Sequence, residues 1–181
     1  GTVKSEEEMR AKIKELIQNQ YNEDADYKFL LDVRKYADEK VGKLEFPEEL
    51  LKRFMKEQNA DKGEEFVENN FAQSLEELKW HLIKEKLVAK AEVKIDDADV
   101  RAAAVKTARF QFAQYGMNNV PEEYLENYAA ELLKDRNQVN GFVERSINEK
   151  LAKALKEVVT LEHKSVSVED FQKLFQDETA E

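Results

Sequence analysis

Hydrophobic residues recur at intervals of three and four along the first part of the chain. This spacing predicts one long helix over residues 5–41, and no Pro or Gly interrupts it. Ser5 and Glu8 have the capping-box spacing that opens such a helix. At 1.5 Å per residue the helix is about 50 Å long. Helices of that length usually connect parts of a molecule that do not share one compact core. Its apolar positions are Met9, Ile13, Leu16, Ile17, Tyr21, Tyr27, Leu30, Leu31, Ala37 and Val41.

Turn-forming residues divide the next part of the chain into shorter helices. Pro47 favours the start of a second helix, and the polar run 59–63 predicts its end. A short helix is predicted to follow this turn. Ser74 and Glu77 again have the capping-box spacing, so we expect a new helix from Ser74 to about Glu92.

The remaining helices are predicted in the same way. Asp96 has the character of an N-cap, and Pro121 starts a further helix after a turn. The helical pattern weakens over 135–141, where Asn and Gly occur, so we expect the following helix to begin near Phe142. Ser167 is placed to start a last short helix.

Aromatic residues concentrate in the hairpin that these signals predict over 110–133. Five of the chain's aromatic residues lie between Phe110 and Tyr128. Because helical residues two positions apart point to different sides, Phe110 and Phe112 cannot share one face. The helical stripes are Val100, Ala104, Ala108, Phe112 and Tyr115 in the first helix, and Leu125, Tyr128 and Leu132 in the second. The hairpin is either an ordinary core, which aromatic stripes usually form, or an exposed clamp that grips apolar partners.

Composition narrows the class of protein. The chain has 181 residues, 38% of them charged, with five glycines and two prolines, which favours an all-α fold. The mean hydropathy is −0.74, and no apolar run approaches the roughly 18 residues that a membrane span needs. The net charge of −10 argues against binding to a nucleic-acid backbone. The absence of cysteine excludes disulfides and thiolate chemistry.

No constellation of residues points to catalysis, and we expect neither an enzyme nor a metal or cofactor site. The two histidines, His81 and His163, have no second ligand at zinc-binding spacing. The acidic group Asp96, Asp97 and Asp99 lacks the glycine and distal glutamate of a calcium loop, and a helix start explains it better. No glycine-rich phosphate loop is present.

The order and spacing of several segments resemble the C-terminal, substrate-binding domain of trigger factor, a bacterial ribosome-associated chaperone. The resemblance extends from residue 5 to residue 175. It rests on the long first helix and on a series of diffuse helical motifs: KLEFPEELLKRFMKEQ, LEELKWHLIKEKLVAKAEVKI, DDADVRAAAVKTARFQFAQYG, VPEEYLENYAAELL and RSINEKLAKALKEVVTLEHKSVSVEDF.

The resemblance implies an all-α fold with an elongated helical body and two projecting helical arms. It predicts one substrate-binding domain over 1–181, with a long connecting helix (5–41), a first arm (43–95), a second arm (96–135) and closing helices (136–175). It also implies an ATP-independent, cytoplasmic chaperone domain that binds apolar segments of unfolded or nascent polypeptides and prevents their aggregation. Neither a ribosome-binding nor a prolyl isomerase domain is found, so we expect an excised piece that reaches the ribosome only through missing domains.

By the same resemblance, the client contacts are apolar residues around the second arm's tip, and the matching positions are near Phe112, Tyr115, Tyr124 and Tyr128. From the residues themselves we also expect contacts at Phe110 and Met117, and a second patch with Phe54 and Phe66. The loop 116–119 is where the chain departs most from the family pattern. Phe71 and Leu75 are expected in the core, because their stripe must be covered.

Other hypotheses remain open at this level. A helical scaffold or adaptor would bind one defined folded partner, whereas a chaperone would bind many unfolded ones. A periplasmic chaperone of related helical build would need a signal peptide, and the N-terminus has no apolar signal core. Self-association through the exposed apolar patch is a further possibility. No direct contact with nucleic acid or membrane is expected.

Overall fold

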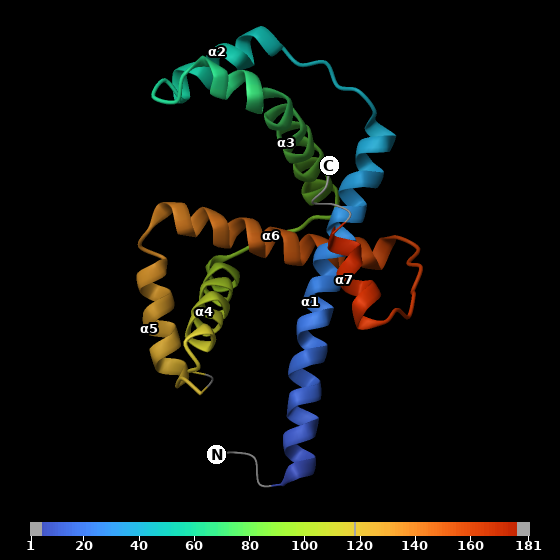
Figure 1. Ribbon diagram of the computed structural model, residues 1–181, viewed down its shortest axis with the longest axis vertical. Helices are drawn as coiled ribbons and strands as arrows, with labels where there is room; N and C mark the ends of the chain where they lie inside the picture. The colour runs from blue at the N-terminus through green and yellow to red at the C-terminus, as the bar shows by residue number, and fades with distance from the viewer. Residues whose placement is uncertain (1–4, 118, 177–181) are drawn as a thin grey trace. The chain divides into compact units, whose positions relative to one another are not determined.

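A computed structural model describes residues 5–117 and 119–176, and within these residues the chain is helical and forms no strand (Figure 1). The all-α prediction is therefore confirmed. The helices are α1 (Glu6–Val41), α2 (Glu48–Gln58), α3 (Glu64–Lys90), α4 (Asp97–Gln114), α5 (Glu122–Leu132), α6 (Arg136–Val158) and α7 (Val168–Gln176).

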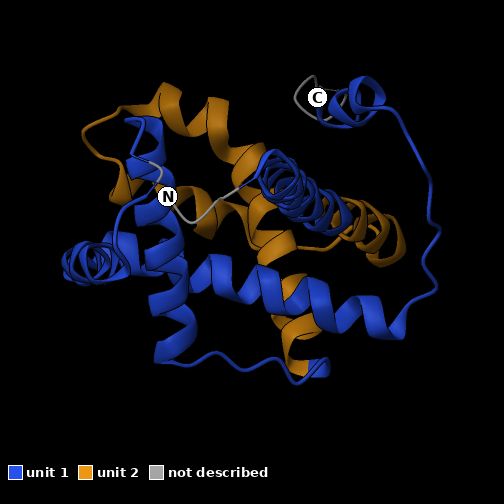
Figure 2. Ribbon diagram, turned by 90° about the horizontal axis from the view of Figure 1, so that it is seen from below, with its two compact units in different colours: residues 1–30, 90–181 blue, residues 31–89 orange. Residues whose placement is uncertain are grey.

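Contacts divide the chain into two compact units, which are coloured separately in Figure 2. The first unit contains residues 1–30 and 90–181, and the second contains residues 31–89. The limits of the connecting helix, the two arms and the closing helices stay predictions.

Several helix starts are held by the side chains that the sequence indicates. The Ser5 hydroxyl oxygen accepts a hydrogen bond of 3.1 Å from the Glu8 amide. At α4 the Asp96 carboxylate accepts from the Asp99 amide (3.1 Å), and the Asp99 carboxylate accepts from the Asp96 amide (2.8 Å). This reciprocal pair satisfies two donors that would otherwise lack a partner in the first turn.

The predicted helix start at Ser74 is wrong, because α3 is one continuous helix from Glu64 to Lys90. The Ser74 hydroxyl donates to the Asn70 carbonyl at 2.9 Å, one turn earlier, instead of capping a new helix. Serine inside a helix commonly bonds in this way. The apolar spacing runs on through Val67 and Phe71, both buried, and no Pro or Gly breaks it.

The predicted start of α6 near Phe142 is also wrong. The helix begins at Arg136, and the carboxylate of the N-cap Asp135 accepts from the Asn137 amide at 2.9 Å. Gly141 therefore lies inside the helix, and a Cβ atom there would meet nothing within 4 Å. A glycine at such a position costs about 1 kcal/mol relative to alanine, which the burial of Phe142 in the core offsets.

The core of the first unit lies where α4 packs against α5 and α6. Its buried residues are Ala103, Ala104, Val105, Ala108, Leu125, Ala129, Leu132 and Phe142, with Val100, Phe112, Val120 and Leu133 packed against them. Four of the buried residues are alanines, which permit the helix backbones to approach closely. Large side chains from α5 and α6 fill the remaining space.

Ion pairs join α1, α4 and α6 within the first unit. The Lys106 ammonium in α4 lies 2.8 Å from Glu23 in α1 and 3.0 Å from Glu149 in α6. Burial lowers the pKa of Lys106, but the hydrogen bonds to the two carboxylates outweigh it, so the pKa is raised. Lys150 in α6 pairs with Asp99 in α4.

The second unit contains the last part of α1, the whole of α2 and nearly all of α3. Val67 and Phe71 are its buried apolar residues, and Lys79 is a buried lysine that pairs with Asp38. The Lys52 ammonium lies 4.9 Å from the centroid of the Phe71 ring. Phe71 is therefore a core residue, as expected.

Among the residues that the structure describes, no helix is both long enough and apolar enough to cross a membrane. Within the same residues, no three histidine or acidic side chains group as ligands for a metal ion.

Candidate functional site

The α4–α5 hairpin places most of the predicted client contacts in one region. Its turn lies at the end of α4 and α5 that is farther from α6 (Figure 1). Gly116 has a φ of 78°, which favours glycine, and its amide donates to the Ala113 carbonyl at 2.9 Å. The Met117 amide donates to the Phe112 carbonyl at 3.0 Å. These bonds end α4 sharply, while Asn118 lies outside the described residues.

Four predicted contacts are exposed around this turn, and we call them the hairpin tip. They are Phe110, Tyr115, Met117 and Tyr124, with exposed fractions between 53% and 81%. Large apolar side chains of this kind are normal on a surface when they occur singly. Here all four lie at the end of α4, in the turn or at the start of α5.

Phe112 and Tyr128 differ from the tip residues, because they lie between the tip and the core. Their ring centroids are 5.3 Å apart in an edge-to-face arrangement. Phe112 is half-buried and packs against the core, whereas Tyr128 keeps 38% of its surface exposed. These two residues therefore support the hairpin, and Tyr128 still offers part of its ring to a partner.

Charged residues fix the hairpin beside the tip. The Arg109 guanidinium in α4 lies 2.7 Å from the Glu122 carboxylate in α5. Farther from the turn, Arg101 lies 3.8 Å from Glu126. Both pairs are exposed, so each stabilises the fold weakly. Their position nevertheless links α4 to α5 near the apolar tip residues.

The other two predicted contacts, Phe54 and Phe66, lie in the second unit and are described with it alone. Phe54 is exposed on α2, while Phe66 is half-buried under the Lys62 ammonium, 4.5 Å from its ring centroid. Leu50, one turn before Phe54, is exposed too. Leu50 is not among the predicted contacts, although its spacing of four places it beside Phe54 on α2.

The first half of α1 carries a further exposed apolar face that the predicted contacts do not include. Met9, Ile13, Leu16 and Ile17 have exposed fractions between 45% and 68%. Their helical spacing was visible in the sequence. The sequence alone could not show that the other described residues leave this stripe exposed to solvent.

Comparison with known protein families decides the identity of the domain. Residues 25–175 match the model of the family described as probable trigger factor, C-terminal domain. The chain belongs to the trigger factor C-terminal domain family. The chain has no significant match among curated proteins or solved structures.

The matched range begins inside α1 and extends through α2–α6 into α7, as far as residue 175. Trigger factor is a chaperone family whose members bind nascent or unfolded polypeptides, which supports a chaperone-type role for this domain. The matched domain is not an isomerase domain. The first residues of α1, including Met9 to Ile17, lie outside the matched range.

Proposed function

We propose that this trigger factor C-terminal domain is an ATP-independent chaperone domain that binds exposed apolar segments of unfolded polypeptides through its hairpin tip. The observation that carries the proposal is the exposure of Phe110, Tyr115, Met117 and Tyr124 around one turn. Burial of this apolar surface against a client supplies the binding free energy, so the mechanism requires no nucleotide.

The chemistry of the tip suits clients of varied sequence. Phenylalanine and tyrosine bury large areas and lose little side-chain entropy. Methionine adapts its shape to different partners, which favours broad rather than narrow recognition. Each contact is weak and reversible by itself.

The exposed pair Leu50 and Phe54 on α2 is a second contact surface in this proposal. A long unfolded client reaches more than one apolar surface of the same molecule. Several weak contacts on one chain then give a higher overall affinity than any single contact. Each contact still dissociates independently, so a client leaves the domain stepwise.

The test is aggregation of a chemically denatured model protein after dilution, with and without the domain, in the absence of nucleotide. We expect suppression at near-stoichiometric ratios. Tyr115→Ser combined with Tyr124→Ser should weaken it several-fold, since the variant removes two exposed rings and leaves the core intact.

A matched single substitution controls for the general loss of an exposed tyrosine. Tyr36 is 62% exposed and Tyr124 is 65% exposed, but Tyr36 belongs to the second unit and is not one of the tip residues. Tyr36→Ser should leave suppression unchanged, whereas Tyr124→Ser should reduce it. Equal suppression by the folded Tyr115→Ser/Tyr124→Ser variant and the original protein would refute the tip as the site. Binding restricted to one folded partner would instead support an adaptor.

A further inference from the structure

The face of α1 that includes Tyr21 and Tyr27 already holds an amphipathic helix. Phe171 of α7 meets Tyr21 edge to face, with ring centroids 5.5 Å apart. Phe175, one turn later, stacks on Tyr27 with centroids 6.4 Å apart and planes inclined by 4°. The two phenylalanine rings also contact each other at 5.4 Å. Within the described residues, α7 therefore docks on α1 through two aromatic side chains four positions apart.

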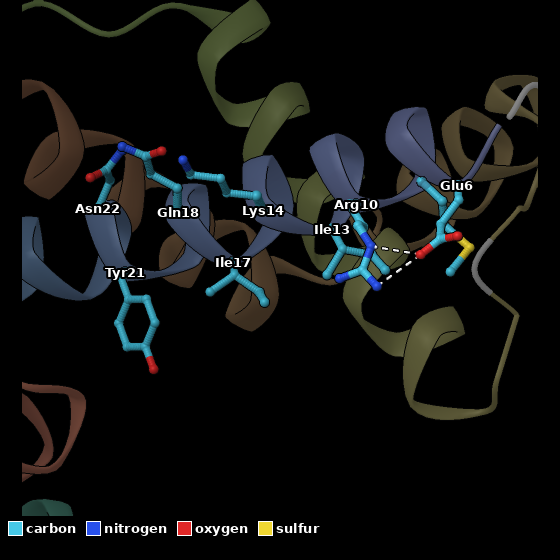
Figure 3. A pocket seen from close by; sticks show the side chains of 9 residues that line it. Glu6, Arg10, Ile13, Lys14, Ile17, Gln18, Tyr21 and Asn22 are labelled. Atoms are coloured by element: carbon cyan, nitrogen blue, oxygen red, sulfur yellow. Dashed lines mark hydrogen bonds and ion pairs between the residues drawn. The ribbon is translucent and has the colours of Figure 1, made fainter.

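The same face continues toward the N-terminus beyond the part that α7 covers. Ile17 and Tyr21 project from one side of α1 (Figure 3). Together with Met9 and Ile13 they line a shallow, open surface whose lining residues all belong to α1 and include Glu6, Arg10 and Lys14. Met9, Ile13, Ile17 and Tyr21 are spaced by four, so they form one continuous stripe. The docked α7 thus occupies one end of a longer apolar surface.

The contact with α7 is small and tethered, which makes it reversible. Phe171 and Phe175 remain half-buried, and Leu174 on the same helix is exposed. Residues 159–167 form no helix and leave most side chains exposed. Each aromatic pair favours the docked state by a factor of about 2 to 12. Because α7 is attached, its effective concentration at α1 is on the order of millimolar.

The segment that already lies on this face indicates the kind of occupant that it takes. α7 contacts α1 through Phe171 and Phe175, which are four positions apart. Charge beside the stripe is nearly balanced and favours neither sign, because Arg10 pairs with Glu6 at 2.8 Å and Glu15 lies next to Lys14.

We propose that the face of α1 from Met9 to Tyr27 is a second client-docking surface. Its occupant is an amphipathic helical segment of a client, with two aromatic residues four positions apart. The chain's own α7 has this chemistry and acts as an intramolecular competitor for the surface. This inference rests on the proposed chaperone function but concerns a surface separate from the hairpin tip.

The test uses the full chain and a fluorescent peptide with the sequence of residues 167–176. Phe171→Ser with Phe175→Ser removes the competitor's rings, so the peptide should bind this variant about 5- to 100-fold more tightly than the original protein. Adding Tyr21→Ser and Ile17→Ser should abolish the gain. A peptide of the same composition, with its phenylalanines two positions apart, should not bind. Circular dichroism checks that each variant is folded.

Three results would overturn the inference. Equal peptide affinity for the original protein and the Phe171→Ser/Phe175→Ser variant would mean that α7 does not compete. A gain that survives Tyr21→Ser with Ile17→Ser would place the peptide elsewhere. Dimers of the peptide-free variant, detected by sedimentation and lost on Ile13→Ser with Ile17→Ser, would assign the surface to a second copy of the chain.

The two proposals are separated by one cross-comparison. Tyr115→Ser with Tyr124→Ser should leave peptide binding to α1 unchanged, because both residues lie at the hairpin tip. Suppression of aggregation that depends on the tip, without peptide binding to α1, would overturn only the second surface. Peptide binding to α1 without suppression that depends on the tip would contradict the proposed function of the tip and leave the surface on α1 standing.

Discussion

The two ends of the α4–α5 hairpin use the same helices but differ in how their apolar residues are covered. At the base, Ala104, Ala108 and Leu125 are almost fully buried, and Phe142 from α6 packs into the same core. At the tip, Tyr115 continues the stripe of α4 and is largely exposed. The difference comes from α6, which packs against α4 and contributes Phe142 to the core at the base. An apolar stripe therefore does not by itself indicate whether it belongs to a core or to a binding surface.

The base and the tip of the hairpin also differ in the type of residue that they contain. The base relies on alanines that bring backbones together, and the tip relies on aromatic rings that extend into solvent. Small residues bury little area each but permit close packing, whereas large exposed rings offer much area to a partner. The base thus specifies the fold, and the tip is available for binding.

Among the tests of this comparison, the substitution Leu125→Ala should have the largest effect on stability. Leu125 is 1% exposed, so its truncation leaves a cavity in the base. We expect the free energy of unfolding to fall by about 2–5 kcal/mol. Chemical denaturation followed by circular dichroism measures it. The adjacent Tyr124→Ala is the matched control and should change stability by only about 0.5 kcal/mol. Similar losses for the two variants would contradict the distinction between base and tip.

The sequence predicted the helical class and many helix limits, because these depend on local signals. The long first helix was predicted over 5–41 and runs from Glu6 to Val41. Capping at Asp96 was predicted correctly as well. The errors at Ser74 and near Phe142 have one physical cause. In both cases tertiary packing maintained a helix across residues whose local preference is to end or weaken it.

The sequence predicted the candidate site as a set of residue types but not the role of each residue. Phe112 and Tyr115 belong to one stripe, yet Phe112 packs against the core and Tyr115 does not. Which of them is covered depends on where α5 and α6 lie in space. The same reasoning explains why the exposed face of α1 was missed, since exposure of a stripe is decided by residues far away in the sequence.

A smaller effect is expected at the boundary between base and tip, where Phe112 contacts Tyr128. The edge-to-face pair at 5.3 Å should contribute a coupling free energy of about 0.5–1.5 kcal/mol. A double-mutant cycle with Phe112→Leu and Tyr128→Leu measures this coupling from the unfolding of the two single variants and the double variant. A cycle between Phe112 and the exposed Phe110 is the control and should give no coupling. A coupling free energy of zero between Phe112 and Tyr128 would contradict the proposed boundary between base and tip.

The smallest effect is expected from a fall in pH, which should destabilise the base of the hairpin before its tip. The hydrogen bond from Lys150, followed by that from the Asp96 amide, holds the pKa of Asp99 below its ordinary value of 3.8. The ionised carboxylate therefore favours the folded state. Its contribution is complete at neutral pH and is lost as the pH falls below about 3.8 toward the lower pKa of the folded protein.

Hydrogen exchange of backbone amides can locate this loss. As the pH falls below about 3.8, and after correction for the intrinsic exchange rate, protection in α4 and α6 should decrease, since Asp99 joins these helices through Lys150. Asp99→Asn should be less protected at neutral pH and should lose much of this pH dependence. A decrease at the tip that precedes the decrease in α4 and α6 would contradict the assignment of the fold's stability to the base.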